Sequence, residues 1–146
     1  MQVIESISPD VIVTNFHKIL GGDIVSAYRN KMINLHYSLL PAFSGLIGVK
    51  PIEGVYNRGC KYLGPTCHLV NEEVDAGYIL SQYAFPTPKL FDEAVTKMFR
   101  SGCLVLLSGI EQTVGESIQY DGKSYPFIDQ RIDKFSECFW NNLANL

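Results

Sequence analysis

The sequence has no long apolar run and little charge. No segment approaches the roughly 18 to 20 consecutive apolar residues that a membrane-spanning helix needs. The first residues, Met-Gln-Val-Ile-Glu, have neither the basic flank nor the apolar block of a signal peptide. Hydrophobic residues make up 47% of the chain and charged residues 18%, which is ordinary for a folded globular protein and argues against disorder. We therefore expect a soluble, cytoplasmic protein with no membrane partner.

A surplus of basic residues is also lacking. The chain has 12 Lys and Arg against 15 Asp and Glu, a net charge of −3, with no basic stripe. Proteins that bind nucleic acid through its phosphate backbone need such a stripe. We therefore expect no nucleic-acid surface, and the weak acidic balance names no other partner.

The cysteines lack the Cys-x-x-Cys spacing that is typical of metal sites. They are Cys60, Cys67, Cys103 and Cys138. A site made of Cys60, Cys67 and His68 is disfavoured, because residues 67 and 68 are adjacent and would point to opposite faces of a strand. We expect reduced thiols and no metal.

Internal repeats, low-complexity segments and linkers are absent from the sequence, and 146 residues suit one core. We expect a single domain over residues 1–146, with residues 110–146 as a C-terminal extension. Within that extension, Asp-Gly at 121–122 predicts a tight hairpin. The apolar spacing over Ile132–Leu146 predicts an amphipathic helix.

The first third of the chain alternates strand and helix patterns. Val11–Thr14 is rich in β-branched residues with apolar side chains on both faces, which predicts a buried parallel strand. Gly21-Gly22-Asp23 predicts a turn, with Asp23 as the N-cap of a helix over Ile24–Arg29. A second strand follows over Met32–Leu35. A strand-helix-strand unit of this length implies parallel strands.

The middle of the chain predicts a hairpin and then a long helix. Strands over Lys61–Val70 and Tyr78–Phe85 flank an acidic turn, so we expect them to pair antiparallel near a sheet edge. Apolar residues recur at helical spacing over Lys89–Ser108. That helix is expected to end at Gly109, and a second helical segment can follow over Ile110–Val114.

Polar and apolar residues alternate along the strand Met32–Leu35. Asn34 and His36 would therefore leave the strand on one face, and Pro41 ends the segment because proline has no amide hydrogen for a ladder. A carboxamide that donates hydrogen bonds, beside an imidazole that titrates near neutrality, suits proton transfer at a carbonyl group.

Two other places offer polar side chains beside glycines. Thr66 and His68 would share one face of a strand, and Asp75 lies just before Gly77. Taken alone, a histidine is usually satisfied by the backbone, and an aspartate before glycine is usually a turn residue. Together, a carboxylate could orient or charge an imidazole on a neighbouring strand while a carboxamide donates to a developing oxyanion.

Three motifs occur in order along this part of the chain. They are Asn-Leu-His-Tyr-Ser-Leu-Leu-Pro at 34–41, Gly-Pro-Thr-Cys-His-Leu-Val at 64–70 and Val-Asp-Ala-Gly at 74–77. The series resembles that of the tetrahydrofolate-dependent formyltransferases. This family includes glycinamide ribonucleotide, methionyl-tRNA and nucleotide-sugar formyltransferases and the hydrolytic formyltetrahydrofolate deformylase. The stretch from Arg58 to Gly64, with Cys67 and His68, is most similar to the deformylase branch.

The resemblance implies an α/β fold: a partial, Rossmann-like formyltransferase sheet, mixed parallel with an antiparallel hairpin, plus C-terminal helices. It implies formyl transfer from 10-formyltetrahydrofolate to an amine acceptor of the nucleotide, sugar or aminoacyl-tRNA type. Two alternatives stay open. One is hydrolysis of the donor to formate and tetrahydrofolate, and the other is a non-catalytic, folate-binding relative.

The resemblance also assigns residues. Asn34, His36 and Asp75 would be catalytic: Asn34 donates to the carbonyl oxygen, His36 stabilises the adduct, and Asp75 holds the imidazole or relays a proton. Ser38, Thr66, His68 and Gly77 would support them. The folate would contact Phe16, Lys18, Ile19, Leu20, Val70, Asn71, Glu72, Glu73, Val74 and Asp75.

The family's N-terminal, acceptor-binding half has no counterpart in the sequence. A sheet without its first strands leaves an unpaired edge that another chain could cover. We therefore expect either a homo-oligomer or a separate N-terminal half, in addition to the folate and the amine acceptor.

Overall fold

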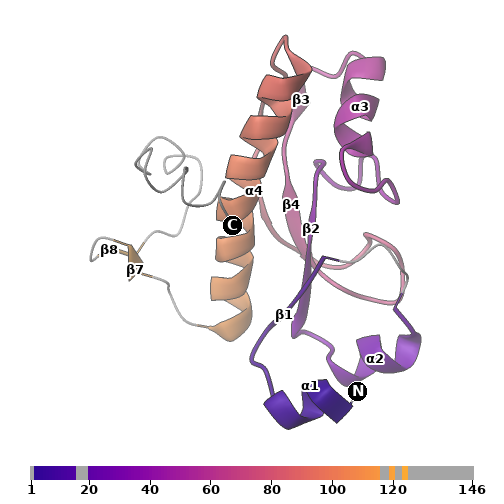
Figure 1. The fold of residues 1–146 in the computed structure, drawn as a ribbon, viewed down its shortest axis with the longest axis vertical. Helices are drawn as coiled ribbons and strands as arrows, with labels where there is room; N and C mark the ends of the chain where they lie inside the picture. The colour runs from indigo at the N-terminus through magenta and orange to yellow at the C-terminus, as the bar shows by residue number, and fades with distance from the viewer. Residues whose placement is uncertain (1, 16–19, 116–118, 121–122, 125–146) are drawn as a thin grey trace.

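The computed structural model describes residues 2–15, 20–115, 119–120 and 123–124 (Figure 1). Two short helices and two strands come first, followed by a third helix, four strands and one long helix. The bounds are α1 Gln2–Ile7, β1 Ile12–Thr14, α2 Gly22–Ala27, β2 Met32–His36, α3 Lys50–Asn57, β3 Tyr62–Leu63, β4 Thr66–Leu69, β5 Ile79–Gln82, β6 Phe85–Pro86 and α4 Phe91–Val114. A small hairpin, β7 Gln119–Tyr120 with β8 Lys123–Ser124, comes last.

The main sheet has the order β1-β2-β4-β5. The pair β1-β2 is parallel, and β2-β4 and β4-β5 are antiparallel. The predicted mixed sheet, the parallel first pair and the hairpin are therefore confirmed. Strands β3 and β6 form a separate antiparallel pair.

Helix α4 runs alongside the main sheet and packs on β2, β4 and β5 (Figure 1). The core between them is a cluster of fully buried side chains, Ile33, Cys67, Leu104 and Val105. A second cluster joins α3 and α4 to the β3-β6 pair through Ile52, Val55, Leu63, Phe85, Ala94 and Met98. Burying this apolar surface is the main stabilising contribution to the fold.

The strand predictions need two corrections. The first strand is not buried on both faces: Val13 is 43% exposed because β1 lies at the edge of the sheet. The predicted strand Lys61–Val70 is divided into β3 and β4 at Gly64-Pro65, and Tyr78–Phe85 is likewise divided into β5 and β6. The hairpin itself lies at the edge of the sheet as expected, with β5 as the outer strand and β4 between β5 and β2.

The predicted helix start at Asp23 is also wrong. Helix α2 begins at Gly22, and Gly21 is its N-cap without a side-chain hydrogen bond. Asp23 lies inside the first turn, where its negative charge faces the positive end of the helix dipole. The residue is therefore at the helix start, but it does not cap it.

Helix α4 continues through the predicted stop at Gly109 and ends at Val114, with Gly115 in the left-handed conformation (φ 73°). Gly109 is buried against β4, where a Cβ would overlap the sulfur of Cys67. The glycine thus allows the helix to approach the sheet and does not terminate it. In the part of the chain that the structure describes, no helix is long and apolar enough to cross a membrane.

The C-terminal predictions are tested only in part. The hairpin around Asp-Gly is confirmed by the pairing of Gln119 with Ser124 and of Tyr120 with Lys123. The two turn residues and the predicted helix Ile132–Leu146 lie outside the described residues.

Replacing Gly109 tests this close contact. An alanine in a helix interior normally stabilises by about 1 kcal/mol relative to glycine, but Gly109→Ala should destabilise by about 1–3 kcal/mol because the core is overpacked. The free energy of unfolding in urea is the measurement, with Gly22→Ala as control, since no atom lies within 4 Å of a Cβ there. Adding Cys67→Ala should recover part of the loss, and a stabilised Gly109→Ala protein would contradict the packing.

Candidate active site

Strand β2 presents two different faces. Ile33 belongs to the cluster under α4, and the methyl groups of Leu35 lie against Gly102 of the same helix. Because side chains alternate along a strand, Asn34 and His36 leave on the opposite face. The side-by-side placement expected from the sequence therefore holds.

Strand β4 places a second histidine beside this pair. Its antiparallel register sets His68 opposite Asn34 and Thr66 opposite His36. The sequence placed His68 on one face of its strand with Thr66, and in the structure the side chain is only 3% exposed. It is buried because β4 is flanked by β2 and β5, a long-range pairing that the local pattern does not contain.

The backbone determines the tautomer of His68. Its Nδ1 lies 2.8 Å from the carbonyl oxygen of Leu69, and a carbonyl can only accept. The hydrogen of the neutral ring is therefore on Nδ1, and Nε2 carries a lone pair. The Asn34 side-chain nitrogen lies 3.3 Å from Nε2 and donates to it, which leaves the second amide hydrogen of Asn34 for another acceptor.

Asp75 reaches both histidines from the loop between β4 and β5. One carboxylate oxygen is 3.4 Å from Nδ1 of His36, and the other is 3.6 Å from Nε2 of His68. The backbone amide of Gly45 donates to this carboxylate at 2.7 Å. Asp75 itself has a left-handed backbone (φ 55°). Asn34, His36 and Asp75 thus meet at one place, with His68 between the carboxamide and the carboxylate.

The loop after β2 folds back over His36. Nε2 of His36 lies 3.1 Å from the carbonyl oxygen of Phe43, a residue in the left-handed region at φ 61°. Ser38 donates its hydroxyl to the carbonyl of Ala42. Thr66 donates to the carbonyl of Ser38 at 2.7 Å. Ser38 and Thr66 therefore hold the loop that closes on the imidazole.

Gly77 has a different kind of role. A Cβ at this position would overlap the carbonyl of Leu69, so only glycine allows the returning chain to pass this close to β4. The same carbonyl accepts the hydrogen bond from His68. Gly77 therefore supports the histidine through the backbone.

The pKa values of His36 and Asp75 are both lowered. Burial lowers the pKa of His36, and the negative charge of Asp75 only partly opposes this. Burial alone would raise the pKa of Asp75, but interactions with His68, the Gly45 amide and His36 outweigh it and hold that pKa below its ordinary value. A neutral His36 can donate to only one of its two neighbours, the Phe43 carbonyl or the Asp75 carboxylate.

This arrangement suits acid-base chemistry at a carbonyl group. A carboxamide N–H can stabilise a developing oxyanion, and the adjacent imidazole and carboxylate can hold or pass on a proton. Within residues 2–15 and 20–115, no group of three or more His, Cys, Asp or Glu side chains is placed to hold a metal ion. Burial raises the pKa of Cys67 to about 12, so that thiol stays protonated at neutral pH.

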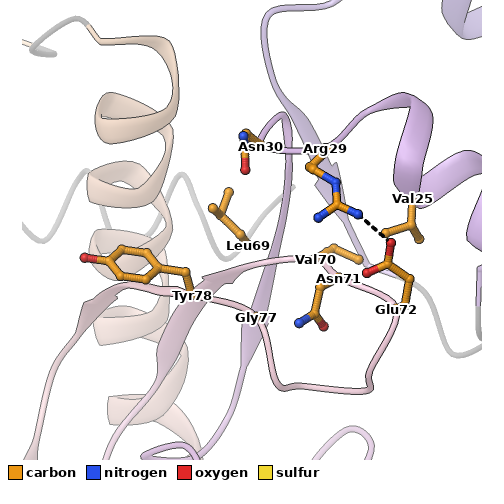
Figure 2. Close-up of a pocket in the computed structure, with 9 residues that line it drawn as sticks. All are labelled: Val25, Arg29, Asn30, Leu69, Val70, Asn71, Glu72, Gly77 and Tyr78. Carbon is orange, nitrogen blue, oxygen red and sulfur yellow. Dashed lines mark hydrogen bonds and ion pairs between the residues drawn. The ribbon is translucent and has the colours of Figure 1, made fainter.

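A shallow hollow of about 130 Å³ lies between α2 and the β4-β5 loop, and three of the ten residues predicted to contact folate line it (Figure 2). Val70, Asn71 and Glu72 line it, and Glu72 pairs with Arg29 at 2.8 Å across one side. Leu20, Glu73, Val74 and Asp75 are described but do not line it. Phe16, Lys18 and Ile19 lie outside the described residues. The three catalytic candidates do not line the hollow either.

The sequence reasoning missed three partners of the site. Two are backbone groups, the carbonyl of Phe43 and the amide of Gly45, which leave no signal in side-chain patterns. The third is Thr14, whose hydroxyl lies 3.2 Å from the side-chain oxygen of Asn34. The predicted parallel pairing of the first two strands could have suggested Thr14, because it places the two residues side by side.

Comparison with known proteins gives the family. The family model described as formyl transferase matches residues 1–101, which is more than half of the chain. The formyltetrahydrofolate deformylase of Haemophilus influenzae is 42% identical over 80 residues, which are 54% of this chain and 28% of that protein. The chloroplastic phosphoribosylglycinamide formyltransferase of Arabidopsis thaliana is 42% identical over 76 residues, 51% of this chain and 26% of that protein.

Solved structures agree. Phosphoribosylglycinamide formyltransferase from Bacillus halodurans superposes with a TM-score of 0.69 at 27% identity, covering 76% of this chain and 57% of the other. A formyltetrahydrofolate deformylase from Pseudomonas syringae gives a TM-score of 0.70 at 29% identity, covering 86% of this chain and 43% of the other. The chain thus spans less than a third of these curated relatives' length. Over the part that it does span, it belongs to the formyl transferase family.

Proposed function

We propose that the chain carries the catalytic centre of an enzyme that transfers a formyl group from 10-formyltetrahydrofolate to an amine acceptor. The observation that carries the proposal is the meeting of Asn34, His36 and Asp75, with the carboxylate 3.4 Å from the imidazole. Membership of the formyl transferase family supports the same reaction class.

The chain's residues fit such a formyl donor in two respects. The second amide hydrogen of Asn34 faces away from His68 and is available to a carbonyl oxygen. The hollow lined by Val70, Asn71 and Glu72 lies beside the same loop that carries Asp75. We propose that this loop binds the ring system of the folate, which supplies the formyl carbon.

Three side chains would then divide the work. Asn34 donates an N–H to the formyl oxygen as that oxygen becomes negative. Asp75 is ionised at neutral pH, since its pKa lies below the ordinary value of an aspartate, and it accepts a proton from the attacking group directly or through water. His36 is buried beside the carboxylate and can pass that proton to the folate nitrogen, which leaves as tetrahydrofolate when its bond to the formyl carbon breaks.

Hydrolysis of the same donor is the second candidate. Formyltetrahydrofolate deformylases from three bacterial species, Haemophilus influenzae, Bacillus subtilis and Escherichia coli, are 40–42% identical over about 80 residues. Water would replace the amine, and the same three side chains would act. The two reactions differ in what the acceptor side of the site admits, so the products distinguish them.

Substitutions at the site test the proposed chemistry. Asn34→Ala, His36→Ala and Asp75→Asn should each lower kcat by about 100-fold or more, because each removes an oxyanion donor or a proton-transfer group. Consumption of 10-formyltetrahydrofolate is the measurement, with and without candidate amines. Formate released without any amine would identify hydrolysis as the reaction.

Two matched variants serve as controls for these substitutions. Asn57→Ala at the end of α3 and Asp92→Asn at the start of α4 remove the same groups outside the site and should keep wild-type rates. If the protein binds 10-formyltetrahydrofolate without consuming it, and Asp75→Asn binds it equally well, a non-catalytic folate-binding protein is favoured. If the folded chain neither binds nor consumes 10-formyltetrahydrofolate, the proposal is contradicted.

Stability should depend on pH through His36. The folded-state pKa of His36 lies below its ordinary value of 6.5. When the pH falls below 6.5, the unfolded chain therefore takes up the proton before the folded chain does, and the free energy of unfolding decreases. Asp75 acts in the same direction but only below its ordinary 3.8. We expect His36→Gln to lose less stability than wild type between about pH 7 and pH 5 in urea unfolding. Equal losses in the two proteins would contradict the lowered pKa.

A further inference from the structure

Thr14 lies next to Asn34 on the neighbouring strand. In the parallel pair β1-β2 the two residues are register partners, so their side chains leave the sheet on the same face. The Thr14 hydroxyl is 3.2 Å from the side-chain oxygen of Asn34 and 3.1 Å from the carbonyl oxygen of Ile33. Both neighbours are acceptors, so the hydroxyl must donate.

The hydrogen bond between His68 and the Leu69 carbonyl determines the direction of the others. The Leu69 carbonyl accepts from Nδ1 of His68, which leaves a lone pair on Nε2. The nitrogen of the Asn34 carboxamide therefore faces His68, and its oxygen faces β1. Three hydrogen bonds therefore link three adjacent strands of the main sheet. Thr14 donates to Asn34, Asn34 donates to His68, and His68 donates to the Leu69 carbonyl.

The opposite orientation of the carboxamide is unfavourable for a neutral His68. It would set the carboxamide oxygen against the Nε2 lone pair at 3.3 Å. In the observed orientation the Thr14 hydrogen lies between two acceptors, the Ile33 carbonyl and the Asn34 oxygen, in a three-centre arrangement. Without the hydroxyl, the carboxamide oxygen would lose its partner on β1.

We propose that Thr14 is a positioning residue for Asn34. Its hydroxyl holds the carboxamide with the N–H side toward the place where an oxyanion develops. A hydrogen bond to the amide oxygen also polarises the amide and strengthens its N–H as a donor. This inference rests on the proposed function, since it assigns Asn34 the role of oxyanion donor.

The test uses the whole chain with three substitutions. Thr14→Val keeps the shape and removes the hydroxyl, and Thr14→Ser keeps the hydroxyl. Thr113→Val is the matched control, because the Thr113 hydroxyl donates to the Gly109 carbonyl within α4 at 2.8 Å, away from β1. Cooperative unfolding of each variant shows that it is folded.

The first readout needs no activity. In the ¹⁵N-labelled protein, the carboxamide signals of Asn34 are assigned by their loss in Asn34→Ala. We expect Thr14→Val to shift the side-chain nitrogen upfield, since the amide oxygen has lost a donor. Thr14→Ser and Thr113→Val should leave the signal in place.

The second readout is kinetic. Thr14→Val should lower kcat by about 10-fold, less than the 100-fold or more expected when the oxyanion donor itself is lost. The KM for the formyl donor should not change, because the hydroxyl makes no contact that binds substrate. Thr14→Ser should restore kcat, which loss of packing alone would not predict.

The outcomes separate the two proposals. An unchanged Asn34 signal and an unchanged kcat in Thr14→Val would overturn the role of Thr14. A shifted Asn34 signal in Thr14→Val, together with a wild-type protein that never consumes the formyl donor, would overturn the proposed function and support the hydrogen bond. If Thr14→Val does not fold, Thr14→Ala takes its place. Thr14→Ala must then shift the Asn34 signal and lower kcat, while Thr14→Ser leaves both at their wild-type values. Any other pattern overturns the inference.

Discussion

The carboxylate of Asp75 is the constraint on which the site depends. Its side chain is 11% exposed and lies within 3.6 Å of two histidine rings that are themselves buried. A buried charge is costly unless it is paired and hydrogen-bonded. The Gly45 amide donates to it and Nδ1 of His36 lies 3.4 Å from it, so the loops after β2 and after β4 must both close on the same point.

The sheet topology makes this closure possible. Only an antiparallel β2-β4 pair in this register sets His68 beside Asn34 and Thr66 beside His36. Thr66 then holds the loop after β2 through the Ser38 carbonyl, and Gly77 lets the chain return close to Leu69. Helix α4 covers the apolar face of β2 and β4, so the polar side chains of the site lie on the opposite face of the sheet.

Local patterns predicted those features that depend on local spacing. The alternation around Asn34 and His36 follows from the two-residue period of a strand, and it needed no knowledge of the fold. The burial of His68 depends on which strand lies next to β4, and the length of α4 depends on Gly109 fitting against Cys67. These are long-range contacts, so neither could be predicted from neighbouring residues. The polar residues beside glycines suggested that Asp75 could approach a histidine, and the family resemblance added its role, but the left-handed backbone that carries Asp75 there has no distinctive pattern of its own.

We propose that Asn34, His36 and Asp75 surround the carbon that reacts. A crystal structure of the chain with a stable analogue of 10-formyltetrahydrofolate would locate that carbon. The oxygen standing for the formyl oxygen should accept a hydrogen bond from the Asn34 side-chain nitrogen, with the reacting carbon facing Asp75. An analogue bound away from these side chains, with the Asn34 amide turned from it, would show that the three residues do not act on the formyl group.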